Sequence, residues 1–259
     1  MPHTMRALAC LMLACCTLGA RADCPKPLRI AFLDKPLPPM LYGEGPRFQE
    51  PPGDFVRWTR EALRRLDCEA ELVRVPQRRL ITDTAADVNQ LTLFLAFTPE
   101  RGALLAFPLR DDGSLDTRLA LAESQLALYV REDRRHLVHW DGRQLSPADL
   151  KVGIVGGGVE EPMARAAGWQ LDLALSHQGS IAKLRRGQVD VAVLPTVSFN
   201  PQSLAEPPAL VPLQPMFAPV YFFAPASPAF QQRHGAWLRQ FWRALCESAR
   251  GPRTLPSCH

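Results

Sequence analysis

The chain has 259 residues, 47% of them hydrophobic, which is enough for one large domain or two modest domains with a buried core. Its formal net charge is only +4, and its arginines are scattered along the sequence. Nucleic-acid binding requires a clustered basic face, so this composition argues against a nucleic-acid partner.

The N-terminus has the pattern of a secretory signal peptide, residues 1–22. One arginine precedes a short apolar run, residues 7–19, and residues 20–22 read A-R-A, an A-x-A cleavage site. The run is too short for a stable membrane span. We predict cleavage before Asp23 and a periplasmic mature protein. An N-terminal core helix, or a lipoprotein modified at a cysteine of the apolar run, are the alternatives.

Cleavage would leave Cys24, Cys68, Cys246 and Cys258. An even number of cysteines in an exported chain indicates disulfides, and four cysteines allow three pairings. Cys24 precedes the first expected strand and Cys68 follows the first expected helix, whereas the other two lie close together at the C-terminus. This placement favours 24–68 and 246–258. A metal site is the alternative, but the C-x-x-C or Cys/His spacings that it needs are absent, and we expect no metal or haem.

The first half of the mature chain alternates expected strands with expected helices. Residues 28–33, LRIAFL, are a nearly continuous apolar run, which is typical of a strand buried on both faces. The segment 54–68 predicts a helix with Asp54 as its N-cap, because Pro-Pro-Gly at 51–53 breaks the chain before it. A strand at 69–76, a helix at 78–89 and an apolar strand at 91–97 are expected to follow.

The second half repeats this alternation. Its expected strands are residues 123–133, 150–155, 169–175, 188–195 and 218–225, and its expected helices are residues 159–168, 177–187 and 227–250. Strands that alternate with helices indicate an α/β protein with mostly parallel sheets. Two such sets, at about 28–110 and 123–200, predict two structural units.

A glycine run separates the expected strand and helix of residues 151–167. This layout suits a phosphate group, because backbone N–H groups and the helix dipole meet at the loop. A nucleotide site needs G-x-G-x-x-G, but Glu161 stands at the last glycine position, and Glu160 adds a second negative charge. We expect the N–H groups of Gly157 and Gly158 to hold a polar or anionic group of a small ligand. A simple tight turn is the alternative.

No motif of a known catalytic class stands out. The sequence has no G-x-S-x-G and no H-E-x-x-H, and the H-x-x-H of His136 and His139 lies in a charged stretch that we expect to face solvent. The neighbouring carboxylates at 111–112 and 160–161 point apart on an extended chain, so we expect them to be solvated. We therefore expect no catalytic residue, no metal and no cofactor.

A set of sequence motifs, taken in their order along the chain, resembles one protein family. LRIAF with a Pro-rich loop, the VPQRR strand end and TPERGALLAFP follow the expected signal peptide, and the last resembles the pattern T-x-x-R-x-x-x-x-x-F-S-x-P. In the second half, LKVGIVGGG resembles an L-x-G-x-x-V-G-V-x-x-G loop, and LRRGQVDVAVLP resembles an L-x-x-G-x-x-D-A strand. Over nearly the whole mature chain, this set resembles the family-3 periplasmic solute-binding proteins, the amino-acid-binding substrate proteins of ABC transporters.

The resemblance implies an α/β protein with the type II periplasmic binding protein fold. In that fold two lobes, each a mostly parallel sheet flanked by helices, are joined by two crossover strands, and the ligand lies in the cleft between them. Lobe 1 would comprise residues 24–119 and 219–259, and lobe 2 residues 120–218.

The resemblance also implies the site. Arg101 stands where the family binds a ligand carboxylate, which a guanidinium group suits because it donates two parallel hydrogen bonds. Asp34 matches a position that contacts the polar end of a ligand, and Arg79 matches an arginine at a helix start near the cleft. The candidate ligand-binding residues are Arg101, Asp34, Tyr42, Arg79, Phe94, Gly157, Gly158 and Thr196.

Two departures from the family bear on the ligand. Residues 91–97 are largely apolar where the amino-acid binders carry serines, and Pro195 falls where they place an aspartate for the α-ammonium group. We therefore expect a carboxylate or other anion without an ammonium, or an aromatic compound stacked on Tyr42, Trp58 or Phe94. Trp58 fits a core position better.

The expected function is capture of a small molecule, by a monomer, for an ABC transporter permease or a membrane sensor. One alternative is a sensor or accessory protein without transport. Another is an enzyme like the periplasmic cyclohexadienyl dehydratases, which share the fold and need a carboxylic acid in the cleft. Asp34 and Glu100 are the nearby candidates for that acid.

Overall fold

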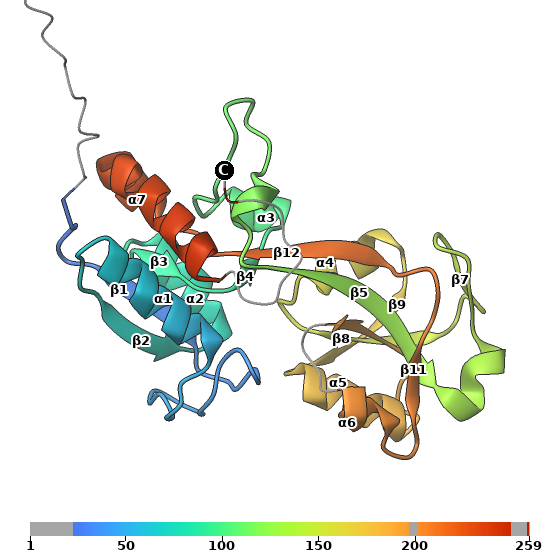
Figure 1. Ribbon diagram of the computed structural model, residues 1–259. Coiled ribbons are helices and arrows are strands. Elements are labelled where there is room, and N and C mark those ends of the chain that lie inside the picture. The colour runs from blue at the N-terminus through green and yellow to red at the C-terminus, as the bar shows by residue number, and fades with distance from the viewer. Residues whose placement is uncertain (1–22, 197–200, 250–257, 259) are drawn as a thin grey trace, which may run out of the picture.

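The computed structural model describes residues 23–196, 201–249 and 258, which form two sheets with helices packed on them (Figure 1). The expected signal peptide lies outside these residues. None of the helices in the described part combines the length and the apolar character that a membrane span requires.

The first sheet has three parallel strands in the order β2-β1-β3. They are β1 (Arg29–Leu33), β2 (Glu71–Val75) and β3 (Leu91–Thr92), and they alternate along the chain with α1 (Asp54–Arg65) and α2 (Gln77–Ala85). The C-terminal helix α7 (Pro228–Ser248) returns to this sheet and lies alongside α1 (Figure 1). Phe32 of β1, Phe55 of α1 and Trp237 of α7 are buried in one common core.

Gly53, and not Asp54, is the N-cap of α1. Gly53 has φ +97°, and a Cβ at this position would lie 2.6 Å from the carbonyl oxygen of Met40. Asp54 lies in the first turn of the helix instead, where its negative charge interacts favourably with the helix dipole and pairs with Arg57. The predicted cap was therefore wrong by one residue, because a close backbone contact requires glycine at the cap position.

The apolar run 91–97 is divided between the two sheets. Its first part is β3 in the first sheet, and β4 (Leu95–Ala96) belongs to the second sheet. Phe94, between them, has φ +64°, a left-handed conformation that is uncommon for a bulky residue. The chain therefore crosses from one sheet to the other at Phe94.

The second sheet has the strand order β4-β12-β5-β10-β8-β9, with β11 beside β5. Its other strands are β5 (Ala122–Arg131), β8 (Lys151–Val155), β9 (Gln170–Ala174), β10 (Val191–Pro195), β11 (Leu210–Pro212) and β12 (Ala218–Phe223). Strands β9, β8 and β10 are parallel, as expected, whereas β5 pairs with β10, β11 and β12 in the antiparallel sense. Strands β5 and β12 run side by side between the two groups of helices (Figure 1).

Shorter elements complete the described part of the chain. They are α3 (Pro99–Gly102), the 3-10 turns η1 (Thr117–Leu119) and η2 (Glu132–Leu137), the hairpin of β6 (His139–Trp140) and β7 (Leu145–Ser146), α4 (Glu160–Ala166), α5 (His177–Arg185) and α6 (Pro201–Ala205). His136 and His139 are exposed, as expected. Among the described residues, no group of His, Cys, Asp and Glu has a metal-binding arrangement.

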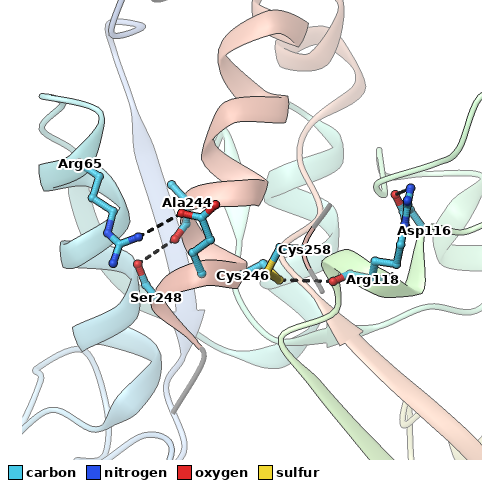
Figure 2. Close-up of a disulfide and its surroundings, with 8 residues drawn as sticks. Arg65, Asp116, Arg118, Ala244, Cys246, Ser248 and Cys258 are labelled. Carbon is cyan, nitrogen blue, oxygen red and sulfur yellow. Dashed lines mark hydrogen bonds and ion pairs between the residues drawn. A yellow bond between two sulfur atoms is a disulfide. The ribbon is translucent and has the colours of Figure 1, made fainter. Parts of the chain in front are cut away.

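Both disulfides have the predicted pairing, Cys24–Cys68 and Cys246–Cys258. The first links the segment before β1 to the segment that follows α1. Figure 2 shows the second, at the C-terminal end of α7, where Sγ of Cys246 lies 3.3 Å from the carbonyl oxygen of Arg118. On the other side of the helix end, Arg65 of α1 pairs with Glu247 at 3.1 Å. The end of α7 is thus fixed to two separate segments of the chain.

Replacing each cysteine pair by serines is expected to lower the free energy of unfolding by different amounts. The sequence separations are 44 and 12 residues, and the entropy of the unfolded chain that a disulfide removes increases with loop length. On this basis Cys24→Ser/Cys68→Ser would cost about 4 kcal/mol and Cys246→Ser/Cys258→Ser about 3 kcal/mol. Urea denaturation of both variants measures the difference, and a larger loss for the C-terminal pair would contradict the expectation.

Candidate functional site

A cavity of about 150 Å³ lies between the two sheets. One side is formed by the loop after β1, by α1, α2 and the crossing segment 93–96. The other side is formed by the end of β8, the glycine loop, the segment 175–178 and Pro195. Both sides therefore contribute residues to one partly open space, and Phe222 of β12 also lines it.

Arg101 lies in the wall of this cavity and is only 7% exposed. Thr98 caps the short helix α3 and accepts a hydrogen bond from the Arg101 N–H at 3.2 Å, which fixes the backbone. The guanidinium donates from Nη1 to the carbonyl oxygen of Ala96 and from Nη2 to that of Gly157, both at 2.8 Å. Burial lowers the pKa of Arg101, while the carboxylates of Glu160 and Glu100 act in the opposite direction.

The carbonyl group of Gly157 connects the two sides of the cavity. It accepts the hydrogen bond from Arg101 and a second one, at 3.3 Å, from Nε2 of Gln77 at the start of α2. Gly157 has φ +75°, a conformation that favours glycine. The glycine loop therefore takes part in contacts across the cleft through a carbonyl oxygen.

The N–H groups of the same loop are engaged within the loop itself. Gly157 donates to Oε2 of Glu161 at 2.7 Å, and Gly158 donates to the carbonyl oxygen of Val155 at 3.0 Å. The N–H contact and the ion pair with Arg165 hold the pKa of Glu161 below its usual range. The free N–H groups that we expected at Gly157 and Gly158 are thus not available in this conformation.

Glu160 is almost completely buried, with 1% of its surface exposed, so the expectation that it is solvated was wrong. Its Oε1 accepts a hydrogen bond from the Val155 N–H at 3.1 Å and lies 3.3 Å from Nε2 of His177. The carboxylate folds back over Gly158, where a Cβ would come within 2.5 Å of Oε2. A glycine two residues earlier therefore makes the space into which the acidic side chain turns.

Three aromatic rings form an apolar part of the wall. Phe94 stacks on Phe222 with ring centroids 4.2 Å apart and an interplanar angle of 3°, and its centroid lies 3.8 Å from that of Phe55. Of the site residues predicted from the sequence, Phe94, Arg101 and Gly158 line this one cavity. Trp58 is buried in the core beside α7 and does not line the cavity.

The other predicted residues lie outside the cavity wall. Arg79 is 62% exposed and pairs with Asp83 along α2. Thr196 accepts a hydrogen bond from the Gln125 N–H at 3.2 Å, at the junction of β10 and β5. Asp34 and Tyr42 belong to the loop after β1. Gly157 reaches the site through its hydrogen bond with Arg101.

Sequence reasoning missed Arg74, which holds the loop after β1 in place. This guanidinium is 5% exposed and donates to carbonyl oxygens of that loop and its flanks. The acceptors are Leu33 (3.0 Å), Tyr42 (3.1 Å), Gly43 (2.7 Å) and Arg47 (2.8 Å). Residues 35–37 of the loop line the cavity, so Arg74 positions one side of the site. The signal in the sequence was a charged residue at an inward-facing position of an apolar strand.

Glu160 and His177 were also missed, as were Gln77, Ser176 and Gln178 in the same wall. The polar residues 176–178 follow the end of β9, and Ser176 caps α5 by accepting a hydrogen bond from Gly179. The carboxyl ends of parallel strands are where α/β proteins bind ligands, and this position was the available signal.

Solved structures establish the fold. The chain is similar to holo ArgBP from T. maritima (TM-score 0.61, 18% identity, covering 87% of this chain and 91% of that chain). It is also similar to the ancestral amino acid-binding protein AncCDT-1, a precursor of cyclohexadienyl dehydratase (0.63, 14%, 85% and 89%), and to a histidine kinase sensor domain with similarity to periplasmic binding proteins (0.63, 14%, 87% and 94%). No protein-family model matches the chain, and no curated protein matches it in sequence. The protein has the type II periplasmic binding protein fold, as expected.

Two glycines of the same loop are expected to respond differently to alanine. In Gly158→Ala the new Cβ would displace the buried carboxylate of Glu160, so we expect a loss of about 1–3 kcal/mol in the free energy of unfolding. Gly156 is the matched control, because a Cβ there would lie 3.9 Å from the nearest atom and its φ is not in the left-handed region. Chemical denaturation of both variants measures the difference, and equal stabilities would contradict the described position of Glu160.

Proposed function

We propose that this protein is an exported solute-binding protein that captures a small organic acid in the cavity between its lobes. The fold is that of binding proteins and sensor domains, and similar structures include an arginine-bound ArgBP and an ancestral arginine-binding protein bound to glutamine. The observation that carries the proposal is the buried guanidinium of Arg101 in the cavity wall. A guanidinium has five N–H donors, and the two backbone contacts leave others for a ligand carboxylate.

The body of the proposed ligand is apolar or aromatic. The rings of Phe55, Phe94 and Phe222 line the same cavity as Arg101 and give its wall an apolar part. At the end of β10 the wall is formed by Pro195, which has no side-chain acceptor for an α-ammonium group. These features favour a carboxylate that is not held in the manner of an ordinary α-amino acid.

The proposed role is delivery to an ABC-type importer from the periplasm. Two disulfides support an oxidising compartment. Ligand binding would close the lobes by a hinge motion, and Phe94 and strands β5 and β12 are where the chain passes between them.

Ligand sensing without transport is the second candidate, because a histidine kinase sensor domain shares the fold. A pull-down from membranes distinguishes the two, since a permease would support import and a signalling protein would support sensing.

A dehydratase-like enzyme has less support. Glu100 is exposed, Asp34 does not line the cavity, and Glu160 is the carboxylate in the wall. Turnover of prephenate or arogenate by the purified protein would establish such an activity.

The test of the proposed function is a thermal-shift screen against organic acids, aromatic acids, amino acids and oligopeptides. A ligand at 100 times its Kd stabilises the folded state by about 2.7 kcal/mol. Arg101→Gln is expected to abolish that stabilisation. It will also lower the stability of the unliganded protein, because the carbonyl groups of Ala96 and Gly157 lose their donor.

The control is Arg79→Gln, which removes an exposed arginine outside the cavity and is expected to keep the full ligand-induced shift. The comparison uses the ligand-induced change within each variant, so that a lower starting melting temperature does not affect it. A full shift in Arg101→Gln would refute the role proposed for Arg101.

A further inference from the structure

The exposed sides of two neighbouring helices carry an excess of positive charge. Helices α1 and α7 lie side by side (Figure 1), and Arg65 of α1 pairs with Glu247 of α7 at 3.1 Å. Because the two helices contain seven arginines and only three acidic residues, their formal net charge is +4. All seven arginines are exposed, and they define the α1/α7 face: Arg65 together with Arg57, Arg60, Arg64, Arg233, Arg239 and Arg243.

The rest of the molecule does not share this charge. The formal net charge of the whole chain is +4, and it falls to +2 when Arg6 and Arg21 are removed with the expected signal peptide. Since α1 and α7 alone carry +4, the remainder of residues 23–259 has a net charge of −2. The molecule is therefore polarised, with positive charge on two helices and a small negative excess elsewhere.

The helical period separates the arginines from the core and from the ligand site. Arg57, Arg60 and Arg64 recur at intervals of three and four residues, which places them on one face of α1. The opposite face of α1 is buried, with Phe55 and Trp58 in the core that α7 also enters. No arginine of the α1/α7 face lines the cavity between the two sheets. A partner on this face would therefore leave the cavity wall untouched.

Part of this positive charge is available to an external partner. Four of the seven arginines pair with acidic residues of the chain. The other three, Arg60, Arg239 and Arg243, form no ion pair with any residue that the structure describes. These three guanidinium groups are exposed and can bind an anion without breaking an existing contact.

The chemistry of the face suits phospholipid headgroups better than a protein. A protein interface is usually built around an apolar centre. In the described part of the chain, the large apolar side chains that are exposed all lie outside α1 and α7. The α1/α7 face thus offers arginines without an apolar centre, and a guanidinium group binds phosphate oxygens through two parallel hydrogen bonds.

We propose that the α1/α7 face binds the anionic phospholipid surface of a membrane. One basic side chain near such a surface raises the binding constant about fivefold, so three unpaired arginines together raise it about a hundredfold. Attachment of this strength is reversible and is weakened by salt, because the Debye length shortens as ionic strength rises. It would hold the protein at the membrane in one orientation and leave the cavity free.

The experiment is co-sedimentation of the mature protein, residues 23–259, with phospholipid vesicles. The probes are vesicles of phosphatidylglycerol mixed with phosphatidylcholine, and vesicles of phosphatidylcholine alone. We expect binding to be about tenfold or more tighter to the anionic vesicles, and to weaken as sodium chloride is added. In the triple variant Arg60→Gln/Arg239→Gln/Arg243→Gln, the affinity for the anionic vesicles is expected to fall about tenfold or more.

The matched control removes the same number of charges from other elements. Arg134 in η2, Arg143 between β6 and β7, and Arg186 at the end of α5 are exposed and lie outside the α1/α7 face. The variant Arg134→Gln/Arg143→Gln/Arg186→Gln has the same net charge as the first triple variant, and it is expected to keep most of the vesicle binding. Melting temperatures of both variants confirm that each is folded.

The outcomes separate the surface from its net charge and from the ligand site. Loss of vesicle binding in the α1/α7 variant but not in the control supports the proposal. Equal losses in both variants would overturn it, because net charge and not this face would then cause binding. No preference for anionic vesicles in the wild-type chain would also overturn it, and would leave an acidic protein surface as the partner to test. Ligand-induced thermal shifts should be the same in both variants, so the proposed function is tested independently.

Discussion

The geometry of the site depends on one buried guanidinium. Arg101 reaches its position because Thr98 caps a helix of a single turn and Pro99 begins it, so that the arginine side chain lies between the lobes. Its donors bind the carbonyl oxygen of Ala96 on one side and that of Gly157 on the other. The contact requires the glycine loop to present a carbonyl group to the cleft. Gly157 therefore has a positive φ, and the N–H groups of the loop point toward Glu161 and Val155.

The same loop explains the position of the acidic side chain. A Cβ at residue 158 would overlap the carboxylate of Glu160, so the glycine there gives space to a group that balances the charge of Arg101. Each step follows from the one before it: a buried cation needs acceptors, the acceptor is a loop carbonyl, and the loop leaves room for an anion. A helix dipole is not required in this account, because α4 is short and the loop N–H groups have partners of their own.

Much of the fold follows from local pattern, and much of the site does not. Alternating apolar runs predict the parallel strands, because strand formation depends on neighbouring residues. The placement of four cysteines around the first and last helices favours the observed pairing. The division of 91–97 into two strands depends on a left-handed Phe94, which an uninterrupted apolar run does not reveal. Arg74 and Glu160 are buried charges with backbone partners. Arg74 donates to a carbonyl group far away in the sequence, whereas the side chain of Glu160 folds back onto the Val155 N–H. The sequence marks Arg74 only as a charged residue in an apolar strand and does not reveal its acceptors, and charged residues are mostly exposed.

Arg101 and Glu160 reach one cavity wall from different strands, and the contacts of Arg101 give closure a chemical basis. Arg101 follows β4, just beyond the crossing at Phe94, and Glu160 follows β8, so both side chains come after strands of the second sheet. Arg101 already donates to the carbonyl oxygen of Gly157 in the glycine loop, so the position of the guanidinium and the approach of the loop are linked. The aromatic rings of Phe94 and Phe222 lie on the segments that pass between the lobes, so the apolar body of the ligand would rest against the hinge. Specificity and closure would then depend on the same few residues.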